Sequence, residues 1–284
     1  MSDADRVVLV DIGARDGIDR RWMPFVGNLS IYAFEPDPVE CDRLNDIEHD
    51  YRITYLPYAL GAVQEEKRTL HITRQPGCSS LLIPNTEFLS GFEYGKQLEV
   101  VRQVEVAVNR LDSILEVSPD VIKIDTQGTE LEILEGSEEL LSNVTAIEVE
   151  VEFVEMYKDQ PLFADVDSFL RSHGFFLRGL RRDFWRNSAR VDQPFGGQLM
   201  HGDALYLRQS LLASEKGFLI LAAYRQYDLL ANLGGTHFIP SQKLFERIVR
   251  RLISLLPYSN RDFRRTVDWA RSGKATDWHD SDFF

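Results

Sequence analysis

The segment VIKIDTQGTELEILEG, residues 121–136, constrains the fold more than any other part of the chain. Its apolar run Val121–Ile124 predicts a short buried strand ending at Asp125, and a turn with Gly128 leads directly into an amphipathic helix. Strand, tight turn and helix in immediate succession are typical of an α/β unit with parallel strands. Ligands bind beyond the carboxyl ends of such strands, so Asp125 is predicted to face a ligand site.

The same alternation of strand and helix runs through the first 175 residues and predicts a doubly wound α/β sheet. Helices are expected over Arg20–Val26, after Asp37 as the cap with Pro38 at the first position, and over Asp165–Ser172. The further predicted strands are Val7–Val10, Ser30–Phe34, Ile53–Leu56, Ala146–Phe153, Phe175–Leu180 and Asp203–Arg208.

Two other regions have a different texture. The β-like stretches Arg68–Thr73 and Leu98–Val108 flank a loop rich in Gly, Pro and Ser, which predicts excursion strands around a mobile loop. After Arg208 the pattern becomes helical, so we predict a first domain over 1–208 and an α-helical extension over 209–284. This extension is locally basic, which fits a solvated helix face or a docking surface for an anionic substrate or a partner. Its expected helices are Leu211–Leu233, Ser241–Leu256 and Arg261–Ser272.

The composition excludes several classes of protein. A net charge of −13, from 45 acidic and 32 basic residues, argues against nucleic acid as a partner. Cys41 and Cys78 lack CxxC spacing, so no zinc site or disulfide framework is indicated and a reducing cytoplasm is expected. The first six residues carry no apolar leader, and no run of 18 apolar residues predicts a transmembrane segment.

The turn after the first strand, DIGARDG at residues 11–17, indicates a nucleotide-type cofactor. Gly13 and Gly17 allow the backbone to turn tightly against a ligand, and Glu35 at the end of the second strand can accept hydrogen bonds from ribose hydroxyls. The glycine spacing fails the GxGxxG fingerprint of dinucleotide folds. Asp11 instead fits the acidic-x-Gly-x-Gly-x-Gly turn of many enzymes that use S-adenosylmethionine (SAM), with Arg15 at the middle glycine. A plain strand–helix turn remains the other reading of this segment.

Further motifs in a specific order and spacing narrow the choice. They are FEPDP (34–38), YALG (58–61), SSL (79–81), KIDTQGTELEILEG (123–136), IEVEVEF (147–153) and MYKDQPLFADVDSFLRSHGFFL (156–177). With the glycine turn, they give a chain that resembles the FkbM family of SAM-dependent methyltransferases over about residues 7–208. The resemblance implies a class I methyltransferase (Rossmann-like) fold with a mostly parallel sheet and an antiparallel last strand.

The resemblance also implies which residues meet the cofactor. Glu35 would hold the ribose, Ala59 and Leu60 would lie near the adenine, and Asp125 would sit beside the methyl-transfer site. The family mostly methylates oxygen, commonly on sugars or natural products, so a small-molecule or glycan acceptor is expected. The full expected cofactor set is Asp11, Gly13, Arg15, Asp16, Gly17, Glu35, Pro36, Ala59, Leu60, Ser80 and Asp125.

A hydroxyl acceptor must lose its proton, either to a carboxylate or histidine or through a divalent metal that lowers its pKa. Asp125 is the predicted base or metal ligand, and a role in orienting the cofactor or capping the turn is the alternative. Glu148 and Glu150 point the same way on their strand, and the one nearer its carboxyl end is expected to approach the site. Gln127 stands where the family usually has Glu, so a role for a second carboxylate is in question. Glu130 could substitute for that carboxylate, but on a helix it is expected to be solvated.

Two histidines and two other functions complete the expectations. His173 is predicted to cap a helix end, and His201 is read as a loop histidine in a turn, from which it could reach an acceptor. Gln127 motivates a non-catalytic SAM-binding protein as one alternative. The fold layout with Glu35 motivates an NAD-dependent oxidoreductase as the other. A homo-oligomer through the C-terminal helices is a further possibility.

Overall fold

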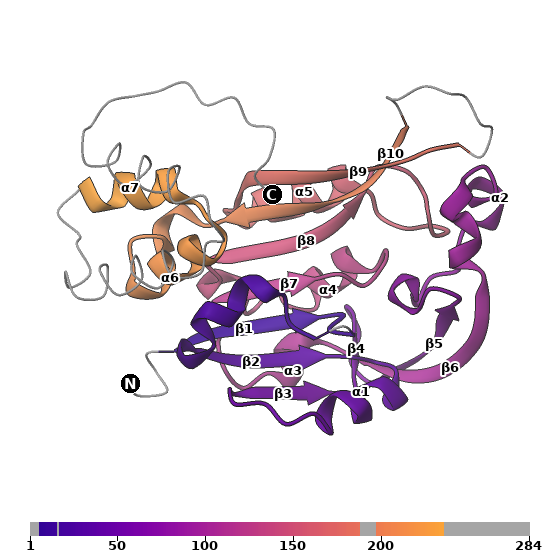
Figure 1. The fold of residues 1–284 in the computed structure, drawn as a ribbon, viewed down its shortest axis with the longest axis horizontal. Coiled ribbons are helices and arrows are strands. Elements are labelled where there is room, and N and C mark those ends of the chain that lie inside the picture. The colour runs from indigo at the N-terminus through magenta and orange to yellow at the C-terminus, as the bar shows by residue number, and fades with distance from the viewer. Residues whose placement is uncertain (1–5, 16, 188–196, 236–284) are drawn as a thin grey trace, which may run out of the picture.

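A seven-stranded sheet forms the centre of the protein (Figure 1). The computed structural model describes residues 6–15, 17–187 and 197–235. The strand order is β3-β2-β1-β7-β8-β10-β9, and β10 runs antiparallel to both its neighbours while the other pairs are parallel. The predicted fold class is therefore confirmed. The strands are β1 (Val7–Ile12), β2 (Leu29–Phe34), β3 (Ile53–Leu56), β7 (Val121–Ile124), β8 (Ala146–Glu152), β9 (Phe176–Trp185) and β10 (Gln198–Leu207).

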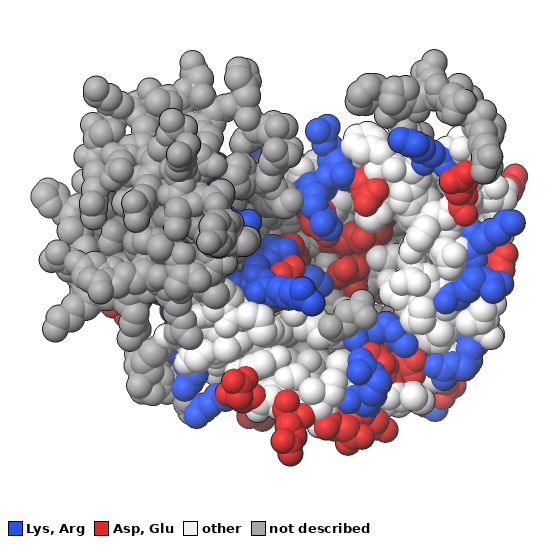
Figure 2. Space-filling model, viewed as in Figure 1, with Lys and Arg blue, Asp and Glu red and all other residues white. Residues whose placement is uncertain are grey.

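The two faces of the sheet are covered differently. On one face, α4 (Glu130–Glu135) and α5 (Phe163–Ser172) pack against apolar residues of β1, β7 and β8. On the other face, η2 (Arg20–Asn28) and α6 (Glu215–Ala223) cover the amino-terminal half of the same strands. The carboxyl-terminal half of that second face carries charged side chains instead. Figure 2 shows acidic and basic atoms meeting in a recess there. The residues are Asp11, Lys123, Asp125, Glu148, Glu150, Glu152, His201 and Asp203.

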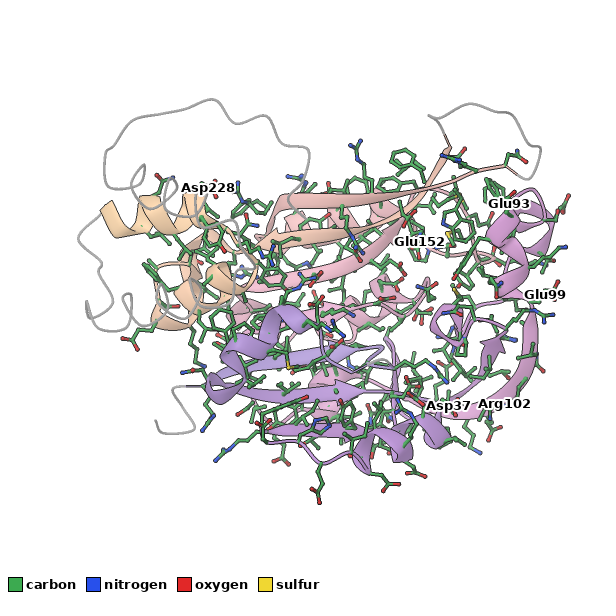
Figure 3. All side chains as sticks on the ribbon, viewed as in Figure 1. Asp37, Glu93, Glu99, Arg102, Glu152 and Asp228 are labelled. Atoms are coloured by element: carbon green, nitrogen blue, oxygen red, sulfur yellow. The ribbon has the colours of Figure 1, made fainter. Side chains whose placement is uncertain are left out.

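A smaller three-stranded sheet, of order β4-β6-β5, confirms the predicted excursion. It lies beside the carboxyl ends of the central strands (Figure 1). Figure 3 shows that Arg102 of this sheet meets Asp37, which is buried; the guanidinium donates to the carboxylate at 2.8 Å. The small sheet is thereby tied to the turn after β2. Its elements are β4 (Ala59–Leu60), β5 (Glu66–Thr73), η3 (Pro76–Cys78), α2 (Thr86–Leu89), η4 (Glu93–Leu98) and β6 (Val100–Asn109).

Short elements complete the described chain. Asp37 caps α1 as predicted, because its side chain accepts from the Val39 amide at 3.3 Å. Within the described ranges, no helix is long and apolar enough to cross a membrane. The remaining short elements are α1 (Pro38–Asn45), α3 (Leu111–Ile114), η5 (Leu141–Asn143), η6 (Gln209–Leu211) and α7 (Tyr227–Gly235).

The single helix predicted over Leu211–Leu233 is wrong. The chain forms α6 and α7 instead, and Arg225 between them adopts a left-handed φ of 55°. The Gln226 amide closes the end of α6 by donating to the Leu221 carbonyl at 2.8 Å. The helices expected over Ser241–Leu256 and Arg261–Ser272 lie outside the described residues.

The last hairpin is longer than predicted. β9 and β10 continue beyond the sheet core, where the side chains of Arg181–Phe184 are exposed and leave no apolar pattern to read. As a result His201 lies on strand β10, and its predicted place in a turn is wrong. A register shift between Leu199 and His201 puts an extra residue into β10 at this point.

Candidate functional site

A cavity opens at the carboxyl ends of β1, β2 and β7. Asp11 lies buried next to it, and Gly17 closes the turn by donating its amide to the Ala14 carbonyl at 2.9 Å. Asp16 falls outside the described residues. The remaining predicted cofactor positions all line the cavity: Gly13, Arg15, Glu35, Pro36, Ala59, Leu60, Ser80 and Asp125. Topology has brought together residues that are far apart in the sequence.

Gly13 is the point where β1 and β7 come closest at this edge. It adopts φ +86°, and its amide donates to the Phe34 carbonyl at 3.0 Å. A Cβ atom at this position would lie 1.9 Å from the main-chain oxygen of Asp125. Only glycine fits, because any side chain would push the two strand ends apart.

Glu35 provides the buried carboxylate of the cavity. It accepts from the Asp37 amide at 2.8 Å, and an Arg15 guanidinium nitrogen lies 3.8 Å away. Burial nevertheless dominates and raises the pKa of Glu35 to about 7. A carboxylate aimed into a cavity with so few donors retains capacity to accept hydrogen bonds from a ligand.

The serine-containing segment 79–81 forms another wall. The Ser80 hydroxyl donates to the Gln127 carbonyl at 2.7 Å and accepts from the Leu82 amide at 2.9 Å. This ties the excursion loop to the turn after β7. Neighbouring Cys78 is a partly buried free thiol, and burial raises its pKa to about 11, which keeps it protonated and unreactive at neutral pH.

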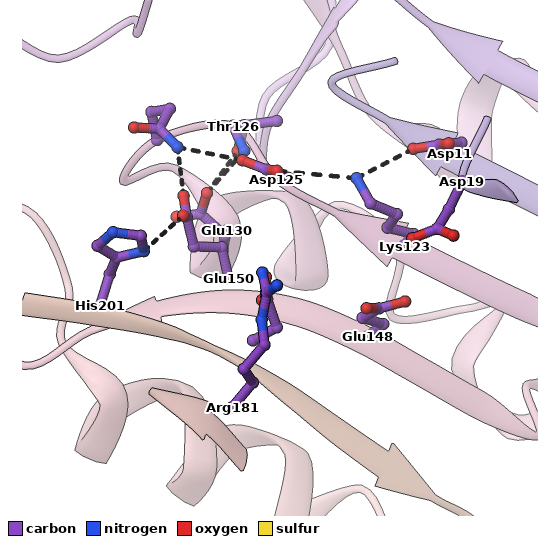
Figure 4. A network of polar contacts seen from close by, with 12 residues as sticks. Asp11, Asp19, Lys123, Asp125, Thr126, Glu130, Glu148, Glu150, Arg181 and His201 are labelled. Carbon is purple, nitrogen blue, oxygen red and sulfur yellow. Dashed lines mark hydrogen bonds and ion pairs between the residues drawn. The ribbon is translucent and has the colours of Figure 1, made fainter. Parts of the chain in front are cut away.

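Lys123 separates two carboxylates at the ends of β1 and β7 (Figure 4). Its ammonium lies 3.4 Å from Asp11 and 3.8 Å from Asp125. Burial would lower the pKa of Lys123, but the two carboxylates outweigh that effect and raise it. Burial raises the pKa of Asp11, and the positive charge of Lys123 opposes this shift. Lys123 is therefore a fixed positive charge beneath the site.

Gln127 joins the carboxylates of β7 and β8. Its Nε2 donates to Asp125 at 3.1 Å and also to Glu150, while its Oε1 accepts from the Tyr157 hydroxyl at 2.9 Å. The residue adopts a left-handed φ of 63°, which these contacts hold in place. Glu148 lies on the same sheet face but nearer η2, where it pairs with Arg21 at 3.0 Å.

The expectation for Glu130 is wrong, because its side chain is only 3% exposed. The helix begins at this residue, and the carboxylate folds back over the preceding turn. It accepts from the Thr126 amide at 2.8 Å, the Thr126 hydroxyl at 3.0 Å and the Gly128 amide at 2.9 Å. Burial raises the pKa of Glu130 to about 7.

Carboxylate oxygens of Glu130, Glu150 and Glu152 lie within 4.8 Å of one another, and Asp125 is not part of this group. Asp125 fits a cation poorly, because the Lys123 ammonium lies near it and Gln127 donates an N–H to it. The oxygens of Glu130 are likewise engaged by backbone amides. The predicted metal-ligand role of Asp125 thus has no support in this geometry.

Both histidines make defined contacts. His173 is the C-terminal cap of α5, as predicted, and its Nδ1 lies 2.9 Å from the Phe169 carbonyl. The Nδ1 of His201 lies 3.0 Å from Glu150 (Figure 4). Sequence reasoning missed this pair and the role of Tyr157. The sequence did contain a signal for this pair. His201 is two residues from Asp203 and four from Leu205, and side chains at this spacing on a strand point to the same face, here the charged face of the sheet.

Comparison with known families identifies the domain. The methyltransferase FkbM domain matches residues 11–177. The chain belongs to the FkbM methyltransferase family. The matched region of this FkbM protein runs from the glycine turn to the first residues of β9, so it includes β7, β8 and both of their acidic ends.

Solved structures of other methyltransferases resemble this FkbM protein at low identity. An FkbM methyltransferase from Methylobacillus flagellatus is 17% identical, with TM-score 0.38, over 70% of this chain and 44% of the other. The present chain thus spans less than half the length of that protein. Magnesium protoporphyrin IX methyltransferase from Synechocystis, solved with bound SAM, is 10% identical with TM-score 0.37, over 73% of this chain and 72% of the other. A comparison with curated proteins finds no match.

Proposed function

We propose that this FkbM protein is a SAM-dependent O-methyltransferase that acts on a hydroxyl group of a sugar, glycan or natural product. The observation that carries the proposal is the cavity in which Gly13, Glu35 and Asp125 meet at the carboxyl ends of three parallel strands. Its position and its residues match the requirements of a nucleoside ligand with a charged amino-acid portion.

The cavity residues divide the cofactor between them in this proposal. Glu35 accepts hydrogen bonds from the ribose hydroxyls, and Ala59 with Leu60 contacts the adenine. The turn with Gly13 and Arg15 lies against the methionine portion, and Ser80 closes the cavity from the excursion. When bound, SAM supplies a methyl group activated by its sulfonium. Asp11, Gly17 and Pro36 shape the turns, and Asp16 keeps its predicted place in the set.

The acceptor in this proposal lies over the charged half of the sheet face (Figure 2). Asp125, with 37% of its side chain exposed, faces the transferred methyl and orients the acceptor, and Glu150 is the second candidate for this role. Glu148 is the weaker candidate, because Arg21 and the Tyr224 hydroxyl hold its carboxylate. Positioning the hydroxyl in line with the sulfonium supplies much of the rate. We also propose that 209–284 is a helical extension that supports homo-oligomers.

Calorimetric titration with S-adenosylhomocysteine (SAH) and, separately, with NAD tests the cofactor. We expect SAH to bind and NAD not to bind; binding of NAD alone would favour the oxidoreductase suggested by the strand order and Glu35. Tritiated SAM with a panel of monosaccharides, glycosides and phenols then tests the reaction. SAH binding without transfer to any member would favour a non-catalytic SAM-binding protein. An Asp125→Asn variant with full turnover would remove Asp125 from the chemistry.

A further inference from the structure

His201 and Glu150 form a pair on the charged sheet face, between β10 and β8. The imidazole Nδ1 lies 3.0 Å from the carboxylate, with the two side chains contributed by the neighbouring strands β10 and β8 (Figure 4). We propose that His201, positioned by Glu150, takes the proton from the acceptor hydroxyl during methyl transfer. This assignment rests on the function proposed above and names the group that receives the proton of the acceptor hydroxyl.

The contacts of Glu150 select the imidazole tautomer. One carboxylate oxygen accepts from the Gln127 amide, and the other faces Nδ1 of His201. In the ionised form of Glu150 both carboxylate oxygens can only accept, so Nδ1 of His201 then carries the hydrogen and Nε2 keeps the lone pair. Across the described ranges, no hydrogen bond to Nε2 of His201 is found. The imidazole is thus oriented at one nitrogen and available at the other.

The surroundings of the pair suit proton transfer. Glu150 is buried, whereas 24% of the His201 side chain is exposed. Burial, together with Asp125 and Glu152, raises the pKa of Glu150 and makes its carboxylate a stronger partner for an imidazolium. The Trp185 ring packs edge-on to His201 with centroids 6.1 Å apart, and so shields one side from water. The extra residue in β10 lies immediately before His201. A bulge at this point changes the direction in which the following side chain leaves the strand.

Three other acids near the pair are already engaged. Asp125 accepts from Gln127 and lies near the Lys123 ammonium, so protonating it would oppose both contacts. Glu148 is paired with Arg21, and Glu130 holds backbone amides of its own turn. Unlike these three acids, His201 can gain a proton while its existing contact becomes stronger, because imidazolium beside a carboxylate is favoured.

The resulting step is balanced. The acceptor oxygen forms a bond to the methyl carbon as the bond from that carbon to sulfur breaks and its electron pair returns to sulfur. The O–H proton moves to Nε2 of His201, which leaves an imidazolium beside Glu150 and, in the cofactor cavity, SAH. Solvent then removes the proton from the exposed imidazolium edge.

Nuclear magnetic resonance of ¹⁵N-histidine-labelled protein saturated with SAH tests the tautomer without any acceptor. We expect neutral His201 to carry its proton on Nδ1 in the wild type and in Glu148→Gln, a matched change on the same face of β8. In Glu150→Leu we expect the proton to move largely to Nε2, the usual site in solution. A proton on Nε2 in the wild type would overturn the proposal, and unchanged tautomers in Glu150→Leu would remove Glu150 as the positioning residue.

Transfer to an acceptor found in the panel provides the second measurement. His201→Gln should lower kcat by about 100- to 10 000-fold with the affinity for SAH unchanged, since general-base catalysis contributes on that order. His173→Gln, a change at the histidine that caps α5, should keep kcat. Full turnover in His201→Gln would overturn the assignment. A wild-type protein that does not bind SAH would instead refute the proposed function. Failure of the His201 assignment and failure of the proposed function are therefore distinguishable.

Discussion

Gly13 and the main-chain oxygen of Asp125 are so close that a Cβ atom on Gly13 would lie 1.9 Å from that oxygen. The glycine also adopts φ +86°, which strains any other residue. Gly13→Ala should therefore lower the free energy of unfolding by about 2–4 kcal/mol in urea and abolish measurable SAH binding. Gly27→Ala is the control, since a Cβ there would meet nothing within 4 Å. Equal stability of both variants would contradict the prediction.

Glu35 should make cofactor binding depend on pH. Burial raises its pKa to about 7, and the ionised form is the one that accepts two ribose hydroxyls. Binding must displace the proton at lower pH, so the affinity for SAH should be constant above pH 7 and fall about tenfold for each unit below it. Titrations in buffers of different ionisation enthalpy should show proton release only below that value. Glu35→Gln should bind SAH more weakly and lose this slope; an identical slope would exclude Glu35 as its source.

Gln127 should be needed to keep Asp125 and Glu150 together. Gln127→Glu removes the N–H groups and adds a carboxylate beside two others. We therefore expect the free energy of unfolding at neutral pH to fall by about 2–4 kcal/mol. Burial and the neighbouring carboxylates raise the pKa of Glu150, so the loss should shrink as pH falls and Glu150 becomes protonated. Magnesium should raise the Tm of this variant more than that of the wild type. Gln198→Glu, at an exposed strand position, is the control and should change neither quantity.

Glu130 should matter for stability more than its place on a helix suggests. Glu130→Ala leaves the Thr126 and Gly128 amides without their buried acceptor, which should cost about 2–4 kcal/mol in the free energy of unfolding. Glu135→Ala, at an exposed position of the same helix, should stay within about 0.5 kcal/mol of the wild type. A pH series adds a sign test. The folded pKa of Glu130, about 7, exceeds its ordinary value of 4.5, so its ionisation should reduce wild-type stability as pH rises between these values.

The parts of the fold that depend on short-range patterns were predictable. Val121–Ile124 is a strand with the expected bounds, because four apolar residues between turn signals leave few alternatives. The break at Arg225 was not predictable in the same way. Apolar residues continue on both sides of it, and only the closing hydrogen bond of α6 reveals where the helix ends.

The site residues also fall into those that short-range sequence predicts and those that it does not. Gly13 and Glu35 follow strands directly, so their place at one edge of the sheet follows from topology alone. Glu130 and His201 were misjudged because their environments come from tertiary packing. A glutamate at a helix start usually meets water, and no local pattern reveals that the turn before it folds under the carboxylate. For His201, the hairpin extends beyond the core and its exposed residues mask the strand.

The contact between Arg102 and Asp37 has a consequence for engineering. A chimera that exchanges residues 82–97 for those of another family member leaves this ion pair intact and keeps Ser80 in the cavity wall, so it preserves the cofactor turn. A chimera that replaces all of β5 to β6 removes Arg102, so that Arg15, 3.6 Å away, is the described cation left beside the buried Asp37 carboxylate. The safe junctions for such grafts therefore lie inside the excursion, not at its ends.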